Sequence, residues 1–590
     1  MLVSHIPAPA TPGPPAPGQT VLEWFSHWAE IRPHAFAVLT SDAQWDYATI
    51  NSLSSDLAAR LREHLVPGDV VGVLLPRSVT LVVTALALAK AGVSYLPLGE
   101  TPPTHRREGI VTAASARHLI ASADHPDLSG HRVIQHSVAD VNLALIETGR
   151  PAGSVEKTPA PYAIATSGST GRPKVVLGTH ESLASLISWL ASRLPIKHED
   201  HVAMAASPSF DAHLIDLWVA LGTGATLVVP PEGVLSSAEG ILEWCANQRV
   251  NSMFLPTPLG ELVMGAAWPA HLVLRSLLVG GDRLRVTPAP DCPAEVLNVY
   301  GPTEAGVVTT THLVTTHEDP LAIPIGTPLS GREVTVTDET GTVLPRGMLG
   351  ELRISGAGLA AGYAGGFLGG FVPAAAGKAR MYRTGDLVLM RHDGVLEFHG
   401  RLDDQFKIDG VRMELAEIEA ALLSFPGVVS ASACLLTTSG GHRQVGAAIA
   451  TSAGASCSES ELLAHTAAHL PGPAVPRTVL LLDDLPTNDN GKVDRATLAK
   501  LLDNRPDTNE EDRSAATVLL AMVHDLVGQD LGLTDSLADA GVNSITTARL
   551  ISRIRDEFDV PVRAIDVIRA ETVADILAAL QRSEAIFTSR

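Results

Sequence analysis

Short apolar segments alternate with helical patterns from about residue 20 to about residue 310, and this alternation most constrains the fold. Asp69–Leu75 has the composition of a buried strand, and Ser78–Ala91 that of the helix behind it. The pattern predicts layered α/β structure with largely parallel sheets. Ligands of such folds bind at the carboxyl ends of the strands, where we expect the site. Further strands are expected at 162–166, 202–206, 226–229, 252–255 and 276–279.

The predicted secondary structure changes twice in the remainder of the chain. Residues 330–400 read as antiparallel strands with glycine turns, and a smaller α+β unit follows Gly400. The last stretch holds helical patterns at 514–528, 544–558 and 572–583, which predict an all-α bundle. The expected organisation is a disordered proline-rich lead (1–19), a layered α/β core with a β-rich subdomain (20–401), a small α+β C-terminal subdomain (402–502), a charged linker (503–513) and a helical bundle (514–585).

Composition excludes several classes of protein. The 590 residues carry 43 Lys+Arg against 64 Asp+Glu, a formal charge of −21, which argues against a general nucleic-acid binder but not against a small anion in a local pocket. Four scattered cysteines without a CxxC pair fit reduced thiols in the cytoplasm. No secretory signal is visible, and no apolar run reaches the roughly 18 residues of a membrane span.

A loop rich in hydroxyl groups and glycine has the properties of a phosphate site. Small residues let backbone N–H groups approach phosphate oxygens, hydroxyls add donors, and a terminal lysine adds charge. Val175 follows the lysine where a Walker A loop needs Ser or Thr, so an ordinary P-loop ATPase is excluded. A flexible surface loop is the alternative. The candidate residues are Thr166, Ser167, Gly168, Ser169, Thr170, Gly171 and Lys174.

Ser544 stands at the start of a helical pattern, after Asp539-Ala-Gly-Val-Asn. A serine at this place is first of all a helix N-cap. The free N–H groups and dipole of a helix N-terminus also suit a phosphodiester. Taken with the phosphate loop, this serine suggests an enzyme that activates a substrate with a nucleotide and loads it onto an arm carried by Ser544.

Four further motifs follow in order: Asn298–Glu304, Tyr382–Asp386, Gly400–Asp404 and Asn490–Arg495. With the phosphate loop, this set resembles the adenylation domains of nonribosomal peptide synthetases, within the adenylate-forming ligases. The resemblance covers roughly residues 20–500, and the region around 514–585 resembles a peptidyl carrier protein.

The resemblance implies a role for each nucleotide-binding residue. The 166–174 loop would hold the β- and γ-phosphates of ATP, and Tyr300 would stack on adenine. Thr303 would contact the α-phosphate. Glu304 would hold Mg²⁺, a hard cation that prefers carboxylate and phosphate oxygens. Asp386, helped by Arg401, would accept hydrogen bonds from the ribose hydroxyls. Asp386 as a turn residue and Glu304 as a helix-start charge are the alternatives.

Three more roles rest on the resemblance. Lys492 would stabilise the attack of the substrate carboxylate on the α-phosphate, where two anions meet. Asp403 would be the hinge about which the small subdomain rotates, withdrawing Lys492. Ser544 would bear 4′-phosphopantetheine. A solvated turn lysine and an ordinary loop aspartate are the alternatives for the first two.

The side-chain pocket can be mapped through the same motifs. Asp211 would pair with the α-ammonium of an amino acid, and Lys492 would meet its carboxylate. The residues between are apolar, so a charged or amide side chain would be buried without partners, at a cost of roughly 2–7 kcal/mol. Valine, leucine or isoleucine is the expected substrate, with tryptophan as runner-up if Gly280 leaves room. The pocket residues are Ala212, Ile215, Phe254, Leu278, Gly280, Val299, Val307 and Val308.

The match to the family is not uniform. Val175 and Ala416 stand where glycine is usual, Gly99-Glu100 replaces Asp-Pro, and Ala361 replaces arginine. Ala416 lies on a loop expected near the pantetheine path, so the second half-reaction is the step these departures affect. No expected phosphate, ribose or magnesium contact is lost.

The sequence therefore predicts a freestanding adenylation–carrier didomain of secondary-metabolite (antibiotic) biosynthesis that uses ATP and Mg²⁺. Its expected partners are the amino acid, a phosphopantetheinyl transferase, and downstream synthetase or tailoring enzymes. Whether a small MbtH-like helper is needed stays open. An acyl- or aryl-CoA ligase is the rival enzyme, which the charge of Asp211 disfavours. A silent scaffold is the rival outside enzymes, which Glu304, Asp386 and Lys492 disfavour.

Overall fold

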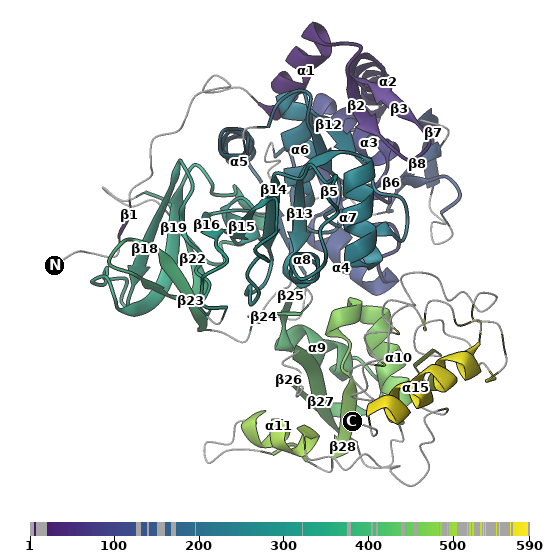
Figure 1. Ribbon diagram of the computed structural model, residues 1–590, viewed down its shortest axis with the longest axis vertical. Helices are drawn as coiled ribbons and strands as arrows, with labels where there is room; N and C mark the ends of the chain where they lie inside the picture. Colours follow the sequence, from purple (N-terminus) through teal and green to yellow (C-terminus); the bar gives the residue numbers. More distant parts are fainter. Residues whose placement is uncertain are drawn as a thin grey trace.

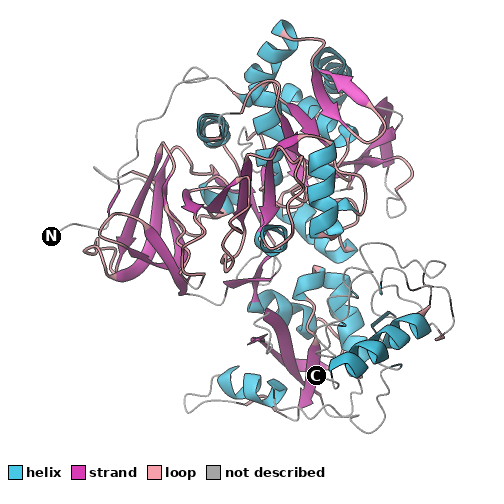
Figure 2. Cartoon of the chain, in the orientation of Figure 1, coloured by secondary structure: helices cyan, strands magenta, loops and turns pink. Residues whose placement is uncertain are grey.

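A computed structural model provides the fold of the chain (Figure 1). It describes residues 5–6, 20–125, 131–138, 141–149, 160–166, 173–194, 196–320, 322–373, 379–402, 405–408, 411–437, 443–452, 457–482, 484–486, 493 and 495–503. Near the C-terminus it describes 516, 519–520, 522–523, 532–533, 535, 537, 550, 554, 567, 570 and 572–587. Figure 2 shows the α/β architecture, which confirms the predicted fold class.

A nine-stranded sheet forms the centre of the core. Its middle strands pair in parallel because helical connections return the chain to the same edge, while its outer strands are antiparallel. In spatial order the strands are β17 (Thr327–Pro328), β16 (Thr310–Val314), β15 (Glu295–Tyr300), β14 (Ser276–Gly280), β13 (Val250–Pro256), β11 (His201–Ala203), β12 (Thr226–Val228), β2 (Phe36–Leu39) and β3 (Gln44–Asp46). Tyr300 and Gly280 stand at the carboxyl ends of β15 and β14, and Phe254 lies near that of β13.

A second sheet of five strands completes the layered core. Helix α3 (Val79–Ala91) is apolar on nearly every side and is buried, as expected for a helix enclosed by the core. Ser78 caps its first turn, and Gly92 ends it with a φ of 72°. The strands are β5 (Ser94–Pro97), β4 (Val70–Leu74), β6 (His118–Ser122), β8 (Val141–Glu147) and β7 (His131–Val138). The other core helices are α1 (Val21–Ile31), α2 (Tyr47–Leu61), α4 (Thr104–Ala113), α5 (His180–Arg193), α6 (His213–Thr223), α7 (Ala238–Asn247) and α8 (Thr257–Met264).

One expected strand joins a different sheet. β9 (Ala163–Thr166) pairs antiparallel with β10 (Lys174–Leu177), and β10 pairs on its other side with β20 (Gly362–Tyr363). The phosphate-loop sequence therefore connects the two strands of a hairpin.

The β-rich subdomain is an antiparallel sheet, as its glycine turns predicted. Alternation of buried and partly exposed residues along β18 directs Val334 and Val336 into its core. Its strands are β1 (His5–Ile6), β18 (Arg332–Thr337), β19 (Leu349–Gly356), β22 (Met381–Met390), β21 (Phe371–Val372) and β23 (Leu396–Arg401). His5 and Ile6 pair with β18, so these two residues of the expected disordered lead form a short strand.

The C-terminal subdomain begins with the hairpin β24 (Gln405–Ile408) and β25 (Val411–Glu414). A three-stranded sheet follows, made of β26 (Val428–Thr437), β27 (Arg443–Thr451) and β28 (Thr478–Leu482). Helices α9 (Leu415–Leu423), α10 (Glu459–His469) and α11 (Arg495–Asp503) pack on this sheet. In Figure 1 the subdomain lies below the core, and α10 contacts α4.

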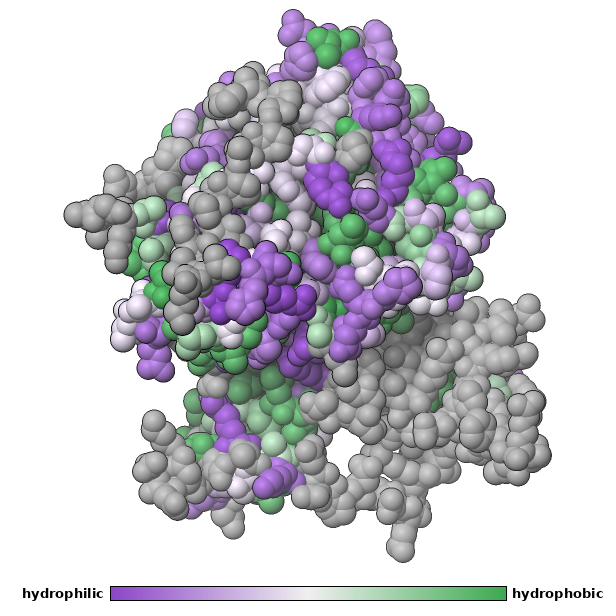
Figure 3. Space-filling model, turned by 60° about the vertical axis from the view of Figure 1, so that its left-hand side comes forward, coloured by the Kyte–Doolittle hydropathy of each residue, from purple (hydrophilic) through white to green (hydrophobic). Residues whose placement is uncertain are grey.

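The region expected to be the helical bundle is described in part. Helix α15 (Val573–Phe587) corresponds to the expected helix at 572–583, and apolar residues before it pack against its buried face. Among the described residues, no helix is long and apolar enough to span a membrane. In Figure 3 apolar residues appear in several separate groups on the visible face of the core.

Candidate active site

The base of the phosphate loop is formed by two residues that face each other across the β9–β10 hairpin. Thr166 and Lys174 are register partners at the ends of the two strands. The Thr166 hydroxyl is buried and has no hydrogen-bond partner among the described residues. A buried orphan hydroxyl beside a lysine fits a site that receives phosphate oxygens. Ser167, Gly168, Ser169, Thr170 and Gly171 lie outside the described residues.

The expected ribose site is assembled from three strands. Tyr300, at the end of β15, donates its hydroxyl to one carboxylate oxygen of Asp386 on β22. Arg401, at the end of β23, donates to the other oxygen. Burial and the neighbouring carboxylate raise the pKa of Tyr300 well above its usual value, so its hydroxyl stays a donor. The aromatic ring and the carboxylate expected at the nucleoside therefore touch each other.

Glu304 lies in the short 3₁₀ helix η2 (Thr303–Ala305) directly after β15, and only 1% of its surface is exposed. The Tyr363 hydroxyl on β20 donates to its Oε1 at 2.7 Å. Burial and the nearby carboxylate raise the pKa of Tyr363. Tyr363 was not among the site residues expected from the sequence. The one sequence feature that could have pointed to it is the pair Gly362-Tyr363 at the end of the 350–363 motif.

A hydrogen bond between Asp211 and Thr303 connects the region expected to bind the amino acid with the region expected to bind the nucleotide. The Thr303 hydroxyl donates to Asp211 Oδ2 at 2.6 Å, although the residues are 92 positions apart. Burial raises the pKa of Asp211, and the Thr303 hydrogen bond opposes the rise. The positive charge of Lys407, on β24, also lowers this pKa, so the C-terminal subdomain reaches the site. Lys407 is a second residue that the sequence analysis did not select.

Seven of the eight expected apolar pocket residues belong to, or pack against, one large hydrophobic cluster of the core. Phe254 and Leu278 are register neighbours on β13 and β14, and Ile215 approaches from α6. The structure corrects one expectation. A Cβ atom on Gly280 would lie 2.5 Å from the Val299 carbonyl oxygen, so this glycine permits close strand packing and does not open local room. The pocket members in the cluster are Ala212, Ile215, Phe254, Leu278, Val299, Val307 and Val308.

A buried arginine supports the pocket wall. Arg332 is fully buried and donates from Nε to the Val308 carbonyl at 2.8 Å and from Nη1 to Ser185 Oγ at 2.7 Å. Its Nη2 also donates to the Gly306 carbonyl. These hydrogen bonds flank a strained residue, because Val307 adopts a φ of 69°, which is uncommon for a β-branched side chain. No sequence motif marked Arg332.

Three expected functional residues cannot be placed. Asp403, Lys492 and Ser544 all lie outside the described residues. Their roles as hinge, adenylation lysine and attachment site stay predictions from the sequence.

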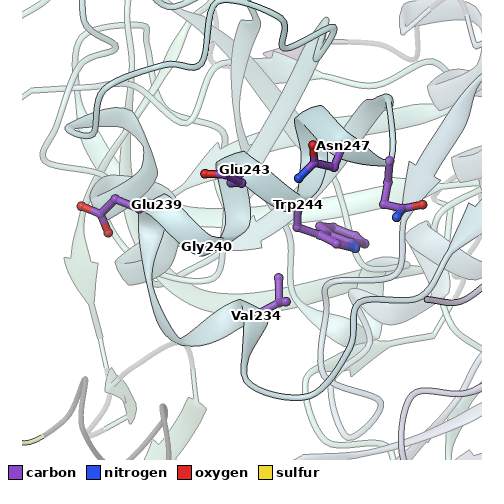
Figure 4. A pocket seen from close by; sticks show the side chains of 7 residues that line it. Val234, Glu239, Gly240, Glu243, Trp244 and Asn247 are labelled. Carbon is purple, nitrogen blue, oxygen red and sulfur yellow. The ribbon is translucent and has the colours of Figure 1, made fainter. Parts of the chain in front are cut away.

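A separate groove of about 390 Å³ lies on α7 and is distinct from the site (Figure 4). Val234 and Trp244 line it, with the carboxylates of Glu239 and Glu243. None of the expected site residues lines this groove. Among the described residues, no cluster of three or more His, Cys, Asp or Glu could hold a metal ion by itself.

Family comparisons agree with this geometry. The AMP-binding enzyme family matches residues 25–364, its C-terminal domain matches 417–492, and the phosphopantetheine attachment site family matches 517–580. The chain therefore belongs to the AMP-binding enzymes. It joins an adenylation domain of the nonribosomal peptide synthetase type to a carrier domain, which confirms the expected family and enzyme class.

Several known proteins are similar to this chain over most of its length. Novobiocin biosynthesis protein H of Streptomyces niveus is 33% identical over 580 residues, covering 92% of this chain and 94% of the relative. Malpibaldin synthetase of Mortierella alpina is 31% identical over 95% of this chain, which spans only 10% of that much longer relative. The structure of holo-PA1221, described as containing adenylation and PCP domains, matches with a TM-score of 0.69 and 26% identity over 96% of both chains.

These families imply ATP, Mg²⁺ and 4′-phosphopantetheine. The residues present fit the nucleotide in chemical type: Thr166 has a buried hydroxyl without a partner, Lys174 opposite it supplies positive charge, and Glu304 is a buried carboxylate. Glu304 is an oxygen ligand of the kind that Mg²⁺ prefers when it also binds phosphate.

Proposed function

We propose that this chain activates an α-amino acid with ATP and transfers it to its own carrier domain. A substrate carboxylate oxygen attacks the α-phosphorus of ATP, a new P–O bond forms, and pyrophosphate leaves. The aminoacyl group then passes to the arm on Ser544, and AMP leaves. When attached there, phosphopantetheine supplies the thiol that accepts the acyl group. The hydrogen bond from Thr303 to Asp211 carries this proposal, since it connects the expected α-phosphate contact to the expected ammonium contact.

Different residues bind different parts of ATP in the first step, the formation of the aminoacyl adenylate. Lys174 and the 166–171 segment hold the β- and γ-phosphates, and Glu304 would hold a magnesium ion, which would supply positive charge beside them. Asp386 and Arg401 hold the ribose beside Tyr300. Lys492 enters between the carboxylate and the α-phosphate and stabilises the developing charge. Rotation about Asp403 then withdraws Lys492. The domain boundaries expected from the sequence are part of this proposal.

We further propose a neutral aliphatic substrate, with valine, leucine or isoleucine as the class. Ile215, Phe254, Leu278, Val299 and Val308 are each buried to 6% exposure or less and offer no polar partner for a substrate side chain. Close packing at Gly280 narrows the pocket and argues against tryptophan. The three aliphatic residues differ by groups worth only about 1–3 kcal/mol each, so the class is proposed and not one member.

The rival reaction is transfer to free coenzyme A. Asp211 disfavours it, because a buried carboxylate with a raised pKa is costly unless a cation binds beside it. A plain carboxylic acid supplies no such cation. The attachment-site family match at 517–580 also provides an acceptor within the chain.

One experiment separates these alternatives. The protein is treated with a phosphopantetheinyl transferase and coenzyme A, then incubated with Mg²⁺, ATP and each common amino acid. Pyrophosphate exchange and intact protein mass are followed together. We expect exchange and a mass gain with aliphatic amino acids. Ser544→Ala should keep exchange and lose the mass gain, whereas Lys492→Ala should lose exchange. Acyl-CoA in solution without a mass gain, or a preference for charged amino acids, would contradict the proposal.

A further inference from the structure

A glycine-flanked loop presents one aromatic ring to the phosphate-loop lysine. The loop is Gly365-Gly366-Phe367-Leu368-Gly369-Gly370, and it follows β20, the strand that pairs with β10. Because Tyr363 is paired with Val176 in antiparallel register, the chain beyond Tyr363 runs toward Lys174 at the start of β10. The Lys174 ammonium lies 5.5 Å from the centre of the Phe367 ring, within the range of a cation–π contact.

Glycine allows this loop its conformation. Gly365, Gly366 and Gly369 have φ values of 81°, 75° and 54°. A side chain on Gly369 would also bring its Cβ within 2.5 Å of the Tyr363 ring. The backbone therefore turns tightly and places Phe367 against Tyr363, with ring centres 5.6 Å apart. The loop is held by its own packing.

The two apolar residues at the tip are similarly exposed but differ in their contacts. Phe367 is 54% exposed and Leu368 is 58% exposed, so neither contributes a buried core contact. Phe367 faces Lys174 and Tyr363, whereas Leu368, an aliphatic residue, offers no ring face to a cation. A large aromatic residue at such an exposed position costs solvation, which its contact with a cation offsets.

Tyr363 extends the arrangement to the expected magnesium ligand. Its ring packs on Phe367, and its hydroxyl donates to Glu304 Oε1 at 2.7 Å. A single segment, 363–367, thus touches the lysine expected at the β- and γ-phosphates and the carboxylate expected at Mg²⁺. One face of an ammonium can rest on a ring while its other N–H groups remain directed toward an anion.

We infer that Phe367 is a positioning residue for Mg·ATP: its ring holds Lys174 in the orientation that receives the phosphates. This inference rests on the proposed function. It adds a residue on a loop that the expected motifs do not include. Holding a flexible side chain in its bound orientation lowers the entropy lost when the ligand binds. The effect should appear in nucleotide binding and should not appear in amino-acid binding.

The test is calorimetric titration of the full chain with Mg²⁺ and α,β-methylene-ATP, without amino acid. Phe367→Leu keeps an apolar side chain and removes the aromatic face. We expect its Kd to rise about two- to fivefold, the range for an exposed cation–π contact. Phe367→Trp should retain wild-type affinity or improve it. Leu368→Ala is the matched control at the same tip and should bind as the wild type does.

A double-mutant cycle with Lys174→Met identifies the partner of the ring. In that background, Phe367→Leu should cause no further loss. The inference is overturned if Phe367→Leu binds the nucleotide with the affinity of the wild type. It is also overturned if Leu368→Ala loses as much affinity as Phe367→Leu. A third contradicting result is that Phe367→Leu loses as much affinity in the Lys174→Met background as in the wild type. If the wild-type protein itself does not bind the nucleotide, the proposed function fails together with the inference.

Discussion

The hydroxyl of Thr303 donates to Asp211 Oδ2 at 2.6 Å, so the residue expected at the α-phosphate also holds the residue expected at the substrate ammonium. Thr303→Val keeps the shape of the side chain and removes this donor. A hydrogen bond to a charged group is worth about 1.5–3 kcal/mol, so we expect the KM for the amino acid to rise roughly ten- to hundredfold.

Pyrophosphate exchange at varied amino-acid concentration checks this prediction. Thr303→Ser is the control and should stay near wild type, since it keeps the donor. An unchanged amino-acid KM in the valine variant would show that the contact does not position Asp211.

Replacing Arg332 by methionine should loosen the pocket wall. Arg332 makes hydrogen bonds to the Val308 and Gly306 carbonyls and to Ser185, and each costs about 1.5–3 kcal/mol when it is lost. We expect a lower unfolding temperature and broader amino-acid selectivity, because the strained backbone at Val307 loses its support. Thermal unfolding and the exchange panel measure the two effects. Arg193→Met, which removes a partly exposed ion pair with Glu295, should change neither by a comparable amount.

An ion pair contributes to the contact between the core and the C-terminal subdomain. Arg106 on α4 donates to Glu417 Oε1 on α9 at 2.7 Å, with side-chain exposures of 15% and 6%. Burial raises the pKa of Glu417, and Arg106 opposes the rise. Arg106→Met would leave the carboxylate without its cation, which typically costs about 3–5 kcal/mol.

We expect this loss to appear as faster proteolysis of the β24–β25 hairpin, with which the C-terminal subdomain begins. Adding Glu417→Leu to Arg106→Met should recover much of the protection, because the buried charge is then absent. Equal cleavage rates in wild type and Arg106→Met would mean that the pair contributes little to the interface.

Acidification should weaken the same interface through His465, which lies in a row of rings with His469 and His105. The rings of His105 on α4 and His469 on α10 are 4.3 Å apart between centres, and those of His469 and His465 are 4.2 Å apart. Burial lowers the pKa of His465, and His469 and His105 lower it further. Because His105 of the core is one cause of this lowered pKa, His465 binds fewer protons in the assembled interface than it would with the two units apart. The stabilisation of the interface by this histidine is therefore complete above about pH 6.5, close to the ordinary pKa of histidine. It is lost progressively as the pH falls below that value.

Protease protection of the β24–β25 hairpin between about pH 5 and pH 8 measures this dependence. Other charged groups at the interface are the Arg106–Glu417 pair and Glu414, and Ser424 Oγ contacts His465 Nε2 at 2.8 Å. His105→Gln should flatten the pH profile, and substitution of the exposed His271 should leave it unchanged. A pH profile that His105→Gln does not alter would contradict the role of the stacked rings.

Local sequence patterns predicted the elements that carry the site. The apolar run before Gly280 was expected as a strand at 276–279 and forms β14 at Ser276–Gly280, and the expected helix at Ser78–Ala91 forms α3 from Val79. Asp386 and Glu304 were selected through motifs and are buried within hydrogen-bond distance of other polar groups. The predictions succeeded here because strand burial, helix capping and glycine turns depend on residues close in the chain.

Other features were inaccessible to that reasoning. Tyr363 reaches Glu304 across 59 positions, and Arg332 reaches Ser185 across 147 positions. Nothing near either residue in the chain marks its partner. Gly280 was expected to open space, yet the backbone of the neighbouring strand occupies the position that a Cβ atom would take.

The sequence by itself therefore determined the family, the α/β fold class and the residue types available for nucleotide and amino-acid chemistry. These properties depend on motifs and periodicities of a few residues. Tertiary structure alone decided that Thr303 meets Asp211, that Arg106 meets Glu417, and that Phe367 lies over Lys174. The physical reason is that hydrogen bonds, ion pairs and ring contacts require atoms within a few ångströms. Only the packing of sheets and helices brings residues from distant segments to that separation.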